Sequence, residues 1–394
     1  MPNPAEVCTM RVAGIDFRDW ETVWVQSRYA ESSPLFRFTA AERRDNPQYW
    51  KLLQFFPGDA CTIFLGGQLA VTGVILTRQV AYEANNHNVM LIGKGVTWWA
   101  ATSSVIHKTG NFDNQSFEQA ARAVLAPHAV GVKVIGALDR TPFKRLQCEP
   151  GELVWDFCER IARPRGVVMG SDHLGNFLFI GKHSGEIVDH LVEGVNILRC
   201  QCIISKEDIY DPYIVSGQTP ASDDKYGKGA SEQEAQTAGT APRFRPRKTP
   251  AEQPVWNIGE IQMRSRFEAQ WGEGTILEAT ITVQGWLRGG TGQLWRAGDD
   301  VKVDSPMIPL NQVMKIKVAT YTQDSNGGTL TTLDLVAPWL LNDNNNFNVG
   351  NSDAPAPPGE ARNTSGDRPA TPPAANPQQP GAEIKESDVQ TTLE

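Results

Sequence analysis

Residues 57–67 read Pro-Gly-Asp-Ala-Cys-Thr-Ile-Phe-Leu-Gly-Gly, a short alternating strand enclosed by two turn signals. Cys61, Ile63 and Leu65 recur at every second position, so their side chains share one face of an extended chain. Gly66-Gly67 is typical of a tight hairpin turn, because glycine accepts the positive φ that such a turn requires. This stretch predicts the first hairpin of an antiparallel sheet.

A longer strand is predicted after the hairpin turn, from Gln68 to Tyr82. Its apolar residues fall mostly on one face: Val74, Leu76, Val80 and Tyr82. Asn85-Asn86 predicts the next turn, and Val89 to Gly95 predicts the returning strand. Residues 57–95 therefore predict three or four antiparallel strands.

The same order of signals returns near the end of the chain. Trp295 to Val303 contains a second Gly-Asp pair and resembles the region around Asp59. Met314 to Tyr321 mirrors Ile75 to Tyr82, and Thr329 to Val336 corresponds to the returning strand. These matches predict two copies of one β-domain. The alternative is the turn chemistry that any two antiparallel sheets share.

Length, charge and composition limit the classes of protein to which this chain can belong. The 394 residues exceed what one hydrophobic core usually holds, so about two to four domains are expected. The formal net charge of −8 argues against a general nucleic-acid binder, because such proteins carry a basic face. The sequence shows neither a secretory signal nor an apolar run long enough for a transmembrane helix, so no membrane insertion is expected.

Six cysteines are spread along the chain: Cys8, Cys61, Cys148, Cys158, Cys200 and Cys202. None belongs to a CxxC pair or to a zinc-like spacing with histidine. Cys200 and Cys202 would share one face of a strand, which is poor geometry for a mutual disulfide. Buried free thiols are the favoured interpretation, and cross-links formed outside a reducing cytoplasm are the alternative.

Residues 100–190 predict a small α+β domain. Ser116 and Gln119 have the spacing of a capping box at the start of an amphipathic helix. A second helix is predicted with Pro150 at its first position. Its apolar residues recur every four positions: Leu153, Phe157 and Ile161. Residues 166–180 predict a β-hairpin.

Two β-barrel-like domains are predicted around this middle domain, over residues 1–99 and 191–345. Within the second, residues 216–254 are polar and rich in Gly, Ala, Ser and Pro, and predict a flexible insertion instead of a packed element. Residues 346–394 predict a disordered Pro- and Asn-rich tail. The predicted fold class is mainly β with α+β.

A basic cluster lies in the insertion: Arg243, Arg245, Arg247 and Lys248. Such a cluster could dock an acidic partner or touch nucleic acid. A solvated loop is the commoner role of a short charged run, and it is the favoured interpretation here.

Motifs that carry chemistry do not occur in the sequence: it has no phosphate loop, nucleophile elbow, HExxH motif or calcium loop. The histidines lack partners at metal-sharing spacing: His87, His107, His128, His173, His183 and His190. Asp59 and Asp299 are matched in the two copies, and their place beside glycine predicts a turn role. No catalytic residue, cofactor-binding residue or metal ligand is predicted, and no enzyme activity is expected. Sequence spacing does not exclude two facing glycosidase carboxylates.

The chain resembles the tail hub proteins of contractile-tailed phages in four signals: Pro57-Gly58-Asp59, Gly66-Gly67, Thr72-Gly73-Val74 and Gly93-Lys94-Gly95. Within that class it is most similar to the Mu-type baseplate hub, also called the gpP-like or late control protein D family. The resemblance is best over residues 56–180 and weaker over residues 255–340. The insertion and the long tail depart from the family pattern.

This resemblance implies a structural role without turnover. The family implies a homotrimer on the tail axis that joins the hexameric tail tube protein to the trimeric central spike protein, beside other baseplate proteins. DNA would pass through the ring, and the protein would be assembled in the host cytoplasm and reside in the virion. The duplication supplies a physical reason, because three chains with two similar domains each present six similar edges.

Three other classes remain open from the sequence. The hub segment of a type VI secretion spike uses the same symmetry adaptor, and a cell-wall hydrolase can be carried on a tail. A carbohydrate-binding β-protein is suggested by the tryptophans: Trp20, Trp24, Trp98, Trp99, Trp286 and Trp295. Their apolar surroundings favour a core or an interface instead.

Overall fold

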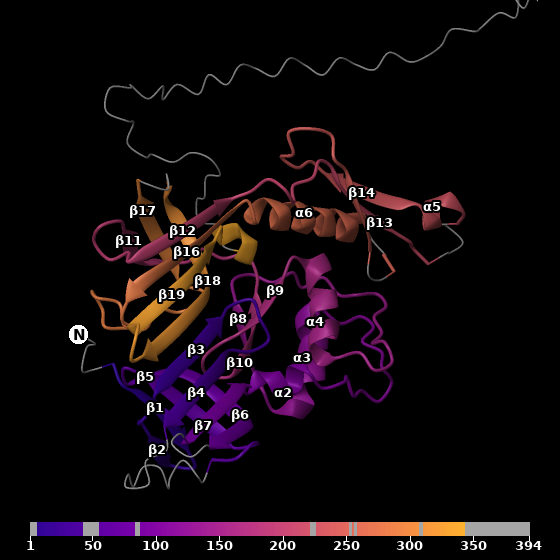
Figure 1. The fold of residues 1–394 in the computed structure, drawn as a ribbon. Coiled ribbons are helices and arrows are strands. Elements are labelled where there is room, and N and C mark those ends of the chain that lie inside the picture. The colour runs from indigo at the N-terminus through magenta and orange to yellow at the C-terminus, as the bar shows by residue number, and fades with distance from the viewer. Residues whose placement is uncertain are drawn as a thin grey trace, which may run out of the picture. The chain divides into compact units, whose positions relative to one another are not determined.

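A continuous β-sheet contains strands from both the N-terminal and the C-terminal part of residues 8–336 in the computed structural model (Figure 1). The structure describes residues 6–41, 55–82, 87–220, 226–251, 254–255, 258–306 and 310–342. The predicted tail after residue 345 and the predicted turn at Asn85-Asn86 lie outside these ranges. The mainly β class with an α+β region is confirmed, and the barrel-like parts take the form of an unclosed sheet.

The N-terminal strands of this sheet are β1 (Cys8–Val12), β2 (Ile15–Phe17), β3 (Thr22–Arg28), β4 (Leu35–Ala41), β5 (Ala60–Leu65), β6 (Gln68–Tyr82) and β7 (His87–Gly95). The C-terminal strands are β11 (Ile187–Val192), β12 (Arg199–Ile204), β16 (Leu277–Gln284), β17 (Asp300–Ser305), β18 (Leu310–Asp324) and β19 (Gly328–Val336). Their hydrogen-bonded order is β12-β16-β19-β18-β3-β4-β7-β6-β5-β1-β2, and β11 joins through β17, which pairs with β18.

The first hairpin forms as its sequence predicts. Cys61, Ile63 and Leu65 are all buried, and they alternate with half-buried neighbours along β5. Gly66 and Gly67 have φ values of 57° and 78°, the left-handed region in which a side chain is strained. The region contains three antiparallel strands, β5, β6 and β7.

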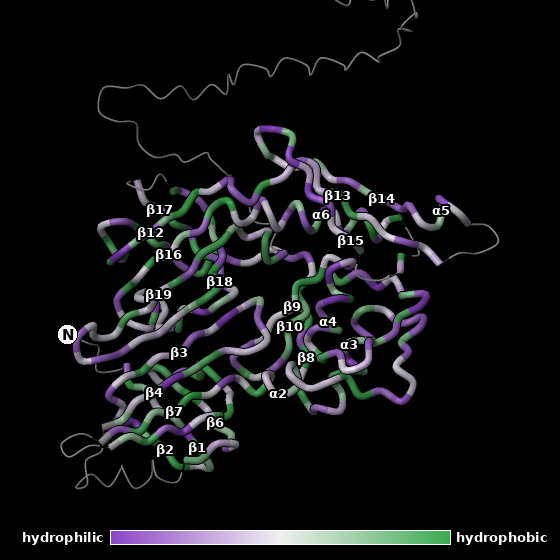
Figure 2. The backbone as a smooth tube through the Cα atoms, turned by 45° about the vertical axis from the view of Figure 1, so that its right-hand side comes forward, coloured by the Kyte–Doolittle hydropathy of each residue, from purple (hydrophilic) through white to green (hydrophobic). Residues whose placement is uncertain are grey.

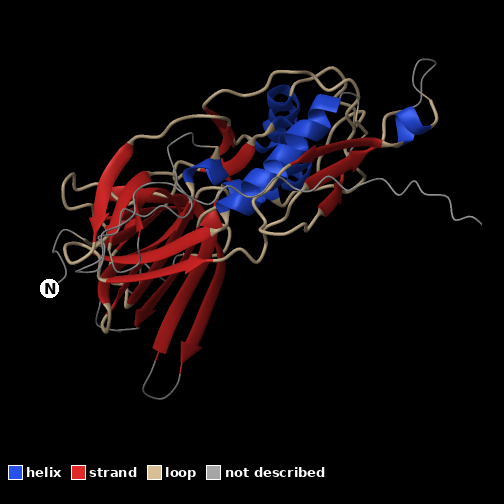
Figure 3. Cartoon of the chain, turned by 90° about the horizontal axis from the view of Figure 1, so that it is seen from above, coloured by secondary structure: helices blue, strands red, loops and turns tan. Residues whose placement is uncertain are grey.

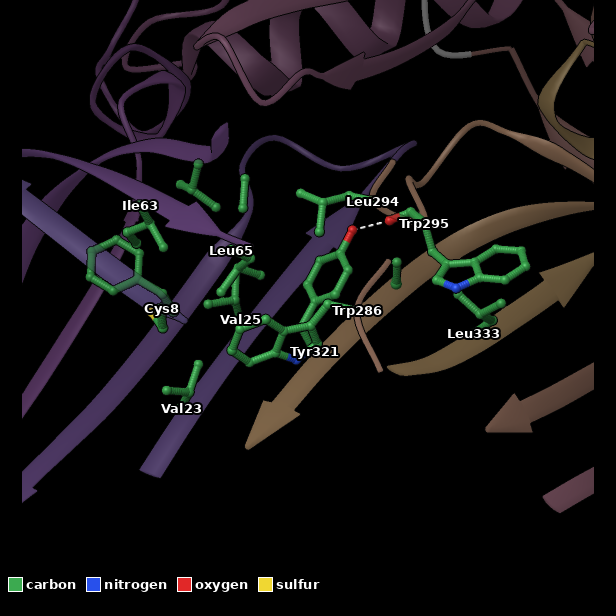
Figure 4. Packing of buried hydrophobic residues seen from close by; sticks show 14 of the residues in the cluster. Cys8, Val23, Val25, Ile63, Leu65, Trp286, Leu294, Trp295, Tyr321 and Leu333 are labelled. Carbon is green, nitrogen blue, oxygen red and sulfur yellow. Dashed lines mark hydrogen bonds between the residues drawn. The ribbon is translucent and has the colours of Figure 1, made fainter. Parts of the chain in front are cut away.

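One hydrophobic core joins the N-terminal and C-terminal strands of the sheet (Figure 4). Trp286, Trp295 and Tyr321 from the C-terminal half pack in the same cluster as Val25 and Leu65 from the N-terminal half. Aromatic side chains of this size bury the largest apolar areas in a core. The two sheet halves are therefore fixed to each other by packing as well as by backbone pairing.

The middle region contains α2 (Thr97–Ala101), α3 (Phe117–Leu125), η1 (Ala126–His128), β8 (Gly131–Ile135), α4 (Val154–Ala162), η2 (Arg163–Arg165), β9 (Val168–Ser171) and β10 (Asn176–Ile180). The capping box of α3 is confirmed: Ser116 Oγ accepts from the Gln119 amide, and the Gln119 side chain accepts from the Ser116 amide. The predicted hairpin is β9 and β10, and β8 adds a parallel strand to it.

The predicted start of α4 at Pro150 is wrong. The helix begins at Val154, with Leu153 in the extended conformation before it. Gly151 has φ +79°, which is incompatible with a helix interior, so Pro150-Gly151 forms a turn instead.

The predicted absence of packed elements in residues 216–254 is also wrong for the described part. Strands β13 (Tyr213–Gly217), β14 (Gln233–Thr237) and β15 (Arg247–Pro250) form a separate sheet, and the short α5 (Lys228–Ser231) lies before β14. Val215 and Ala235 of this sheet share a small cluster with Ile261 of helix α6 (Ile258–Gly274). A few buried apolar side chains are enough to pack a segment whose composition is otherwise polar.

The long helices pack with the two small sheets, apart from the main sheet. Seen from above, the long helices lie together beside the strands of the main sheet (Figure 3). Hydrophobic segments follow the sheet strands and the hairpin β9-β10 (Figure 2). The helix η3 (Pro338–Leu341) packs Leu340 and Leu341 against Ile180, which ties the middle region to the end of the sheet. No helix within the described ranges is long and apolar enough to cross a membrane.

Candidate assembly interface

The Gly-Asp corner of the first copy is held by a specific set of backbone bonds. The Gly58 amide donates to the Ile75 carbonyl at 2.7 Å, and the Ile75 amide donates to the Asp59 carbonyl at 3.0 Å. The Asp59 carboxylate accepts from the Phe56 amide at 2.7 Å. Asp59 thus has the turn role that its place beside glycine predicts.

The second copy repeats this corner. The Gly298 amide donates to the Ile316 carbonyl at 2.7 Å, and the Ile316 amide donates to the Asp299 carbonyl at 2.9 Å. The Asp299 carboxylate accepts from the Arg296 amide at 3.3 Å. Gly58 and Gly298 both have φ +98°. Shared turn chemistry alone does not require the same bonds to the same strand, so the prediction of two copies is supported at atomic level.

The strand order extends this match over six strands. The path β3-β4-β7-β6-β5-β1 of the first copy corresponds to β12-β16-β19-β18-β17-β11 of the second. The long strand has an irregularity at the same place in both copies, between Ile75 and Thr77 and between Ile316 and Val318. One pairing differs: β1 is antiparallel to β5, whereas β11 is parallel to β17.

The residue-level alignment predicted from the sequence is wrong by two positions. The backbone bonds match Ile75 with Ile316 instead of Met314. Carried along the strand, this register matches Val80 with Tyr321 and Tyr82 with Gln323. The connections before the long strands differ in length, which hides the true register in the sequence.

The two copies meet where β3 pairs with the second half of β18, from Arg28 opposite Val318 to Val23 opposite Gln323. Tyr321 lies opposite Val25 in this pairing, and its hydroxyl donates to the Trp295 carbonyl (Figure 4). The junction is therefore both paired and packed.

The edges that correspond to this junction have no partner among the described strands. β12, the counterpart of β3, pairs only with β16. The half of β6 from Thr77 to Tyr82, the counterpart of the β18 half at the junction, pairs only with β7. We call these two segments the open edges. They carry exposed apolar side chains, with Val80 51%, Ile203 53% and Ile204 63% exposed.

A buried ion pair distinguishes the second copy. Lys315 Nζ lies 2.5 Å from Asp300 Oδ1, and both side chains are almost fully buried. Lys315 also donates to the Gly298 carbonyl at 3.0 Å, beside the Gly-Asp corner. Asp300 and Lys315 lie opposite each other across β17 and β18, and the first copy has Ala60 and Val74 there.

The six cysteines are free thiols in this structure. Cys8, Cys61 and Cys158 are buried, and burial raises the pKa of each thiol, for Cys61 to about 12. Cys200 and Cys202 share one face of β12, as predicted, but they are only half-buried. Burial raises the pKa of the Cys200 thiol to about 11. A raised pKa means a low thiolate population near neutral pH, so Cys8, Cys61, Cys158 and Cys200 are weak nucleophiles.

No group of three or more His, Cys, Asp or Glu residues in the described part of the chain could hold a metal ion. Half-buried His173 has its pKa lowered, by burial first and then by the Arg296 charge. Trp286 and Trp295 are buried in the core, whereas Trp99 is 50% exposed. The tryptophans therefore do not form one exposed sugar-binding platform.

The basic cluster of residues 243–248 contacts the segment that precedes β13 and, through Lys248, its own sheet. The Arg245 guanidinium donates to the Glu207 and Ile209 carbonyls and lies over the Tyr210 ring. Arg247 also lies over that ring, and Lys248 pairs with Glu234. These contacts position β15 beside β13, so sequence reasoning missed a structural use of the charges.

Matches to known proteins follow the same division of the chain. Residues 7–95 match the family "Mu phage baseplate assembly protein GpP-like, N-terminal", and residues 101–181 match "Baseplate hub protein gp44-like, second domain". Residues 260–342 match "Mu phage baseplate assembly protein GpP, fourth domain". The first match contains the whole first copy, and the third contains β16 to β19 of the second copy without β11 and β12.

Whole-chain comparisons agree with these matches. The chain is 25% identical over 328 residues to the baseplate hub protein gp44 of Escherichia phage Mu, covering 81% of this chain and 85% of that protein. The fold is similar to the 43 kDa tail protein of prophage MuSo2 from Shewanella oneidensis, with a TM-score of 0.72, 22% identity, and coverage of 86% of this chain and 100% of that one. A tail protein from Neisseria meningitidis MC58 gives a TM-score of 0.72 at 20% identity, with 85% and 98% coverage.

The fold shows two copies of one β-unit, and the matched families define a phage tail protein. Within that class, the chain belongs to the Mu-type GpP/gp44-like family of baseplate hub proteins.

Proposed function

We propose that this protein is the structural hub of a contractile phage tail baseplate, a homotrimer that adapts the hexameric tail tube to the trimeric central spike. The observation that carries the proposal is the matched pair of strand sets in one chain, joined at β3 and β18. Three chains related by a threefold axis would present six similar units to the tube and three whole chains to the spike. Closed symmetry makes each contact repeat around the ring.

The role proposed here is geometric and does not involve turnover. DNA would pass through the ring lumen, and the net charge of −8 is compatible with a surface that does not retain a polyanion. The protein would be assembled with other baseplate proteins in the host cytoplasm and remain in the virion. A test of the non-enzymatic role is a peptidoglycan suspension, whose turbidity the purified protein should leave unchanged.

Sedimentation of the purified full chain tests the trimer. We expect a particle of three times the chain mass of 43.3 kDa, ring-shaped in electron micrographs and able to bind the cognate tube and spike proteins. A stable monomer at micromolar concentration that binds neither protein would contradict the proposal.

A further inference from the structure

The junction inside the chain is a template for a junction between chains. β3 and the second half of β18 pair across the two copies, and their counterparts, β12 and the second half of β6, are the open edges. A strand edge with unpaired backbone groups and exposed apolar side chains favours pairing with another chain. In a ring of similar units, the pairing seen once within each chain must recur once between neighbouring chains.

We propose that β12 of one subunit pairs antiparallel with residues 77–82 of β6 in the next subunit, in the register of the β3–β18 junction. This inference rests on the proposed trimer and specifies its subunit contact. The partner of each open edge is thus a second copy of this chain.

The register follows from the matched strands. Val25 lies opposite Tyr321 at the internal junction. The backbone match assigns Val80 to the position of Tyr321, and the β3-β4 and β12-β16 pairings assign Cys202 to the position of Val25. Val80 of one subunit therefore lies opposite Cys202 of its neighbour.

Neighbouring positions follow in the same way. Val23 corresponds to Cys200, so Cys200 lies opposite Tyr82 of the next chain. Gln26 corresponds to Ile203, which then lies opposite Gln79. One bond at the end of the internal junction extends the template: the Tyr29 amide donates to the Lys317 carbonyl at 3.0 Å. Its counterpart would join the Lys206 amide to the Leu76 carbonyl of the neighbour.

Burial and side-chain type fit this assignment. Val23 and Val25 are buried at the internal junction, whereas Cys200 and Cys202 are only partly buried in the single chain. Val80 is 51% exposed, although its counterpart Tyr321 is 2% exposed. Pairing the open edges would cover these side chains and satisfy the free backbone groups together.

A cysteine at position 80 tests the register through the native Cys202. Residues directly opposite in an antiparallel pair have Cα atoms about 4.5–5.5 Å apart, within the range that a disulfide spans. We expect Val80→Cys, oxidised with copper phenanthroline in air, to give a covalently closed trimer on a non-reducing gel. The unmodified chain should remain monomeric on that gel, and dithiothreitol should reverse the cross-link.

Matched variants distinguish a cross-link that depends on the proposed strand register from nonspecific oxidation of cysteines. Val80→Cys with Cys202→Ser removes the opposite thiol and should give no cross-link. Ala81→Cys shifts the thiol by one residue to the other face of the strand, so it should not reach Cys202. A second pair on that other face, Gln79→Cys with Ile203→Cys, should cross-link in the Cys202→Ser background.

The outcomes distinguish this junction from the proposed function. A trimer in sedimentation that neither cysteine pair links would overturn the register and leave the trimeric hub intact. Covalent dimers without trimers would indicate a twofold contact and overturn the head-to-tail junction. A chain that stays monomeric in sedimentation would overturn both proposals.

Discussion

The long strands β6 and β18 have corresponding backbone bonds and opposite surroundings. In both, an isoleucine exchanges two backbone bonds with a Gly-Asp corner, and the strand is irregular just beyond it. The second half of β18 is covered by β3, whereas the second half of β6 is uncovered in the single chain. Exposure follows this difference: Tyr321 is buried, and its counterpart Val80 is half-exposed.

This contrast shows that duplicated units keep their backbone pattern while their side chains adapt to what lies beside them. Copy-specific features gather in the second copy, near the junction with β3. The corner at Gly298 packs against Tyr29, and the ion pair of Asp300 and Lys315 lies beside it. Substitutions at matched positions therefore measure how much stability comes from the shared backbone and how much from the surroundings.

The largest expected effect is at Lys315. Lys315→Ala would leave the buried Asp300 carboxylate without its cation, which costs about 3–5 kcal/mol of unfolding free energy. Grafting the first copy's residues, Asp300→Ala with Lys315→Val, removes both charges and should recover most of that loss. Urea unfolding at one protein concentration measures both variants. A double variant as unstable as Lys315→Ala would show that the unpaired Asp300 charge does not cause the loss of stability.

The two corner glycines should differ in their tolerance of alanine. Both have φ +98°, so alanine adds about 1–3 kcal/mol of backbone strain in either copy. At Gly298 the new Cβ would also lie 2.5 Å from a Tyr29 ring carbon, whereas nothing lies within 4 Å at Gly58. Gly298→Ala should therefore lower the melting temperature more than Gly58→Ala. Equal decreases in melting temperature would mean that the Tyr29 ring moves aside without a free-energy penalty.

Tyr321→Phe should cost about 1–3 kcal/mol, because the Trp295 carbonyl loses its donor in the core. Burial raises the pKa of Tyr321, so the folded state holds this proton more tightly than the unfolded state. The free energy of unfolding that this tighter proton binding contributes is fully present below the pKa of about 10 that tyrosine has in the unfolded chain. It is lost as pH rises through the higher pKa of Tyr321 in the folded state. Urea titrations at pH 8 and at pH 11 should show a smaller stability difference between wild type and Tyr321→Phe at the higher pH.

The smallest effect is expected at Asp59. Asp59→Ala removes one exposed hydrogen bond to the Phe56 amide, worth about 0.5–1.5 kcal/mol. Asp59→Asn keeps an acceptor oxygen and serves as the matched control. If both variants lose the same stability, the carboxylate charge contributes more than the bond.

The sequence predicted the backbone skeleton better than the register. Gly-Asp pairs and alternating strands depend on local chemistry, so the corners and the first hairpin could be read directly. The false match of Tyr82 with Tyr321 arose because residue identity was used where only backbone bonding is preserved. The strands β14 and β15 were missed because their few buried residues, such as Ala235, look like loop composition. Predicting the open edges requires knowing which strands pair with each other, and the residue pattern of a single strand does not contain this information.

The junction of β3 with β18 also constrains the order of folding. Its partners, such as Val25 and Tyr321, are almost 300 residues apart in the chain, so the contact forms only after the last strands have left the ribosome. Contacts between such distant segments close slowly. Until then, β3 exposes the same kind of edge as β12, and nascent chains on one messenger could join incorrectly through it. Completion of the C-terminal copy thus removes the β3 edge from such incorrect pairing, while the open edges stay available to neighbouring chains.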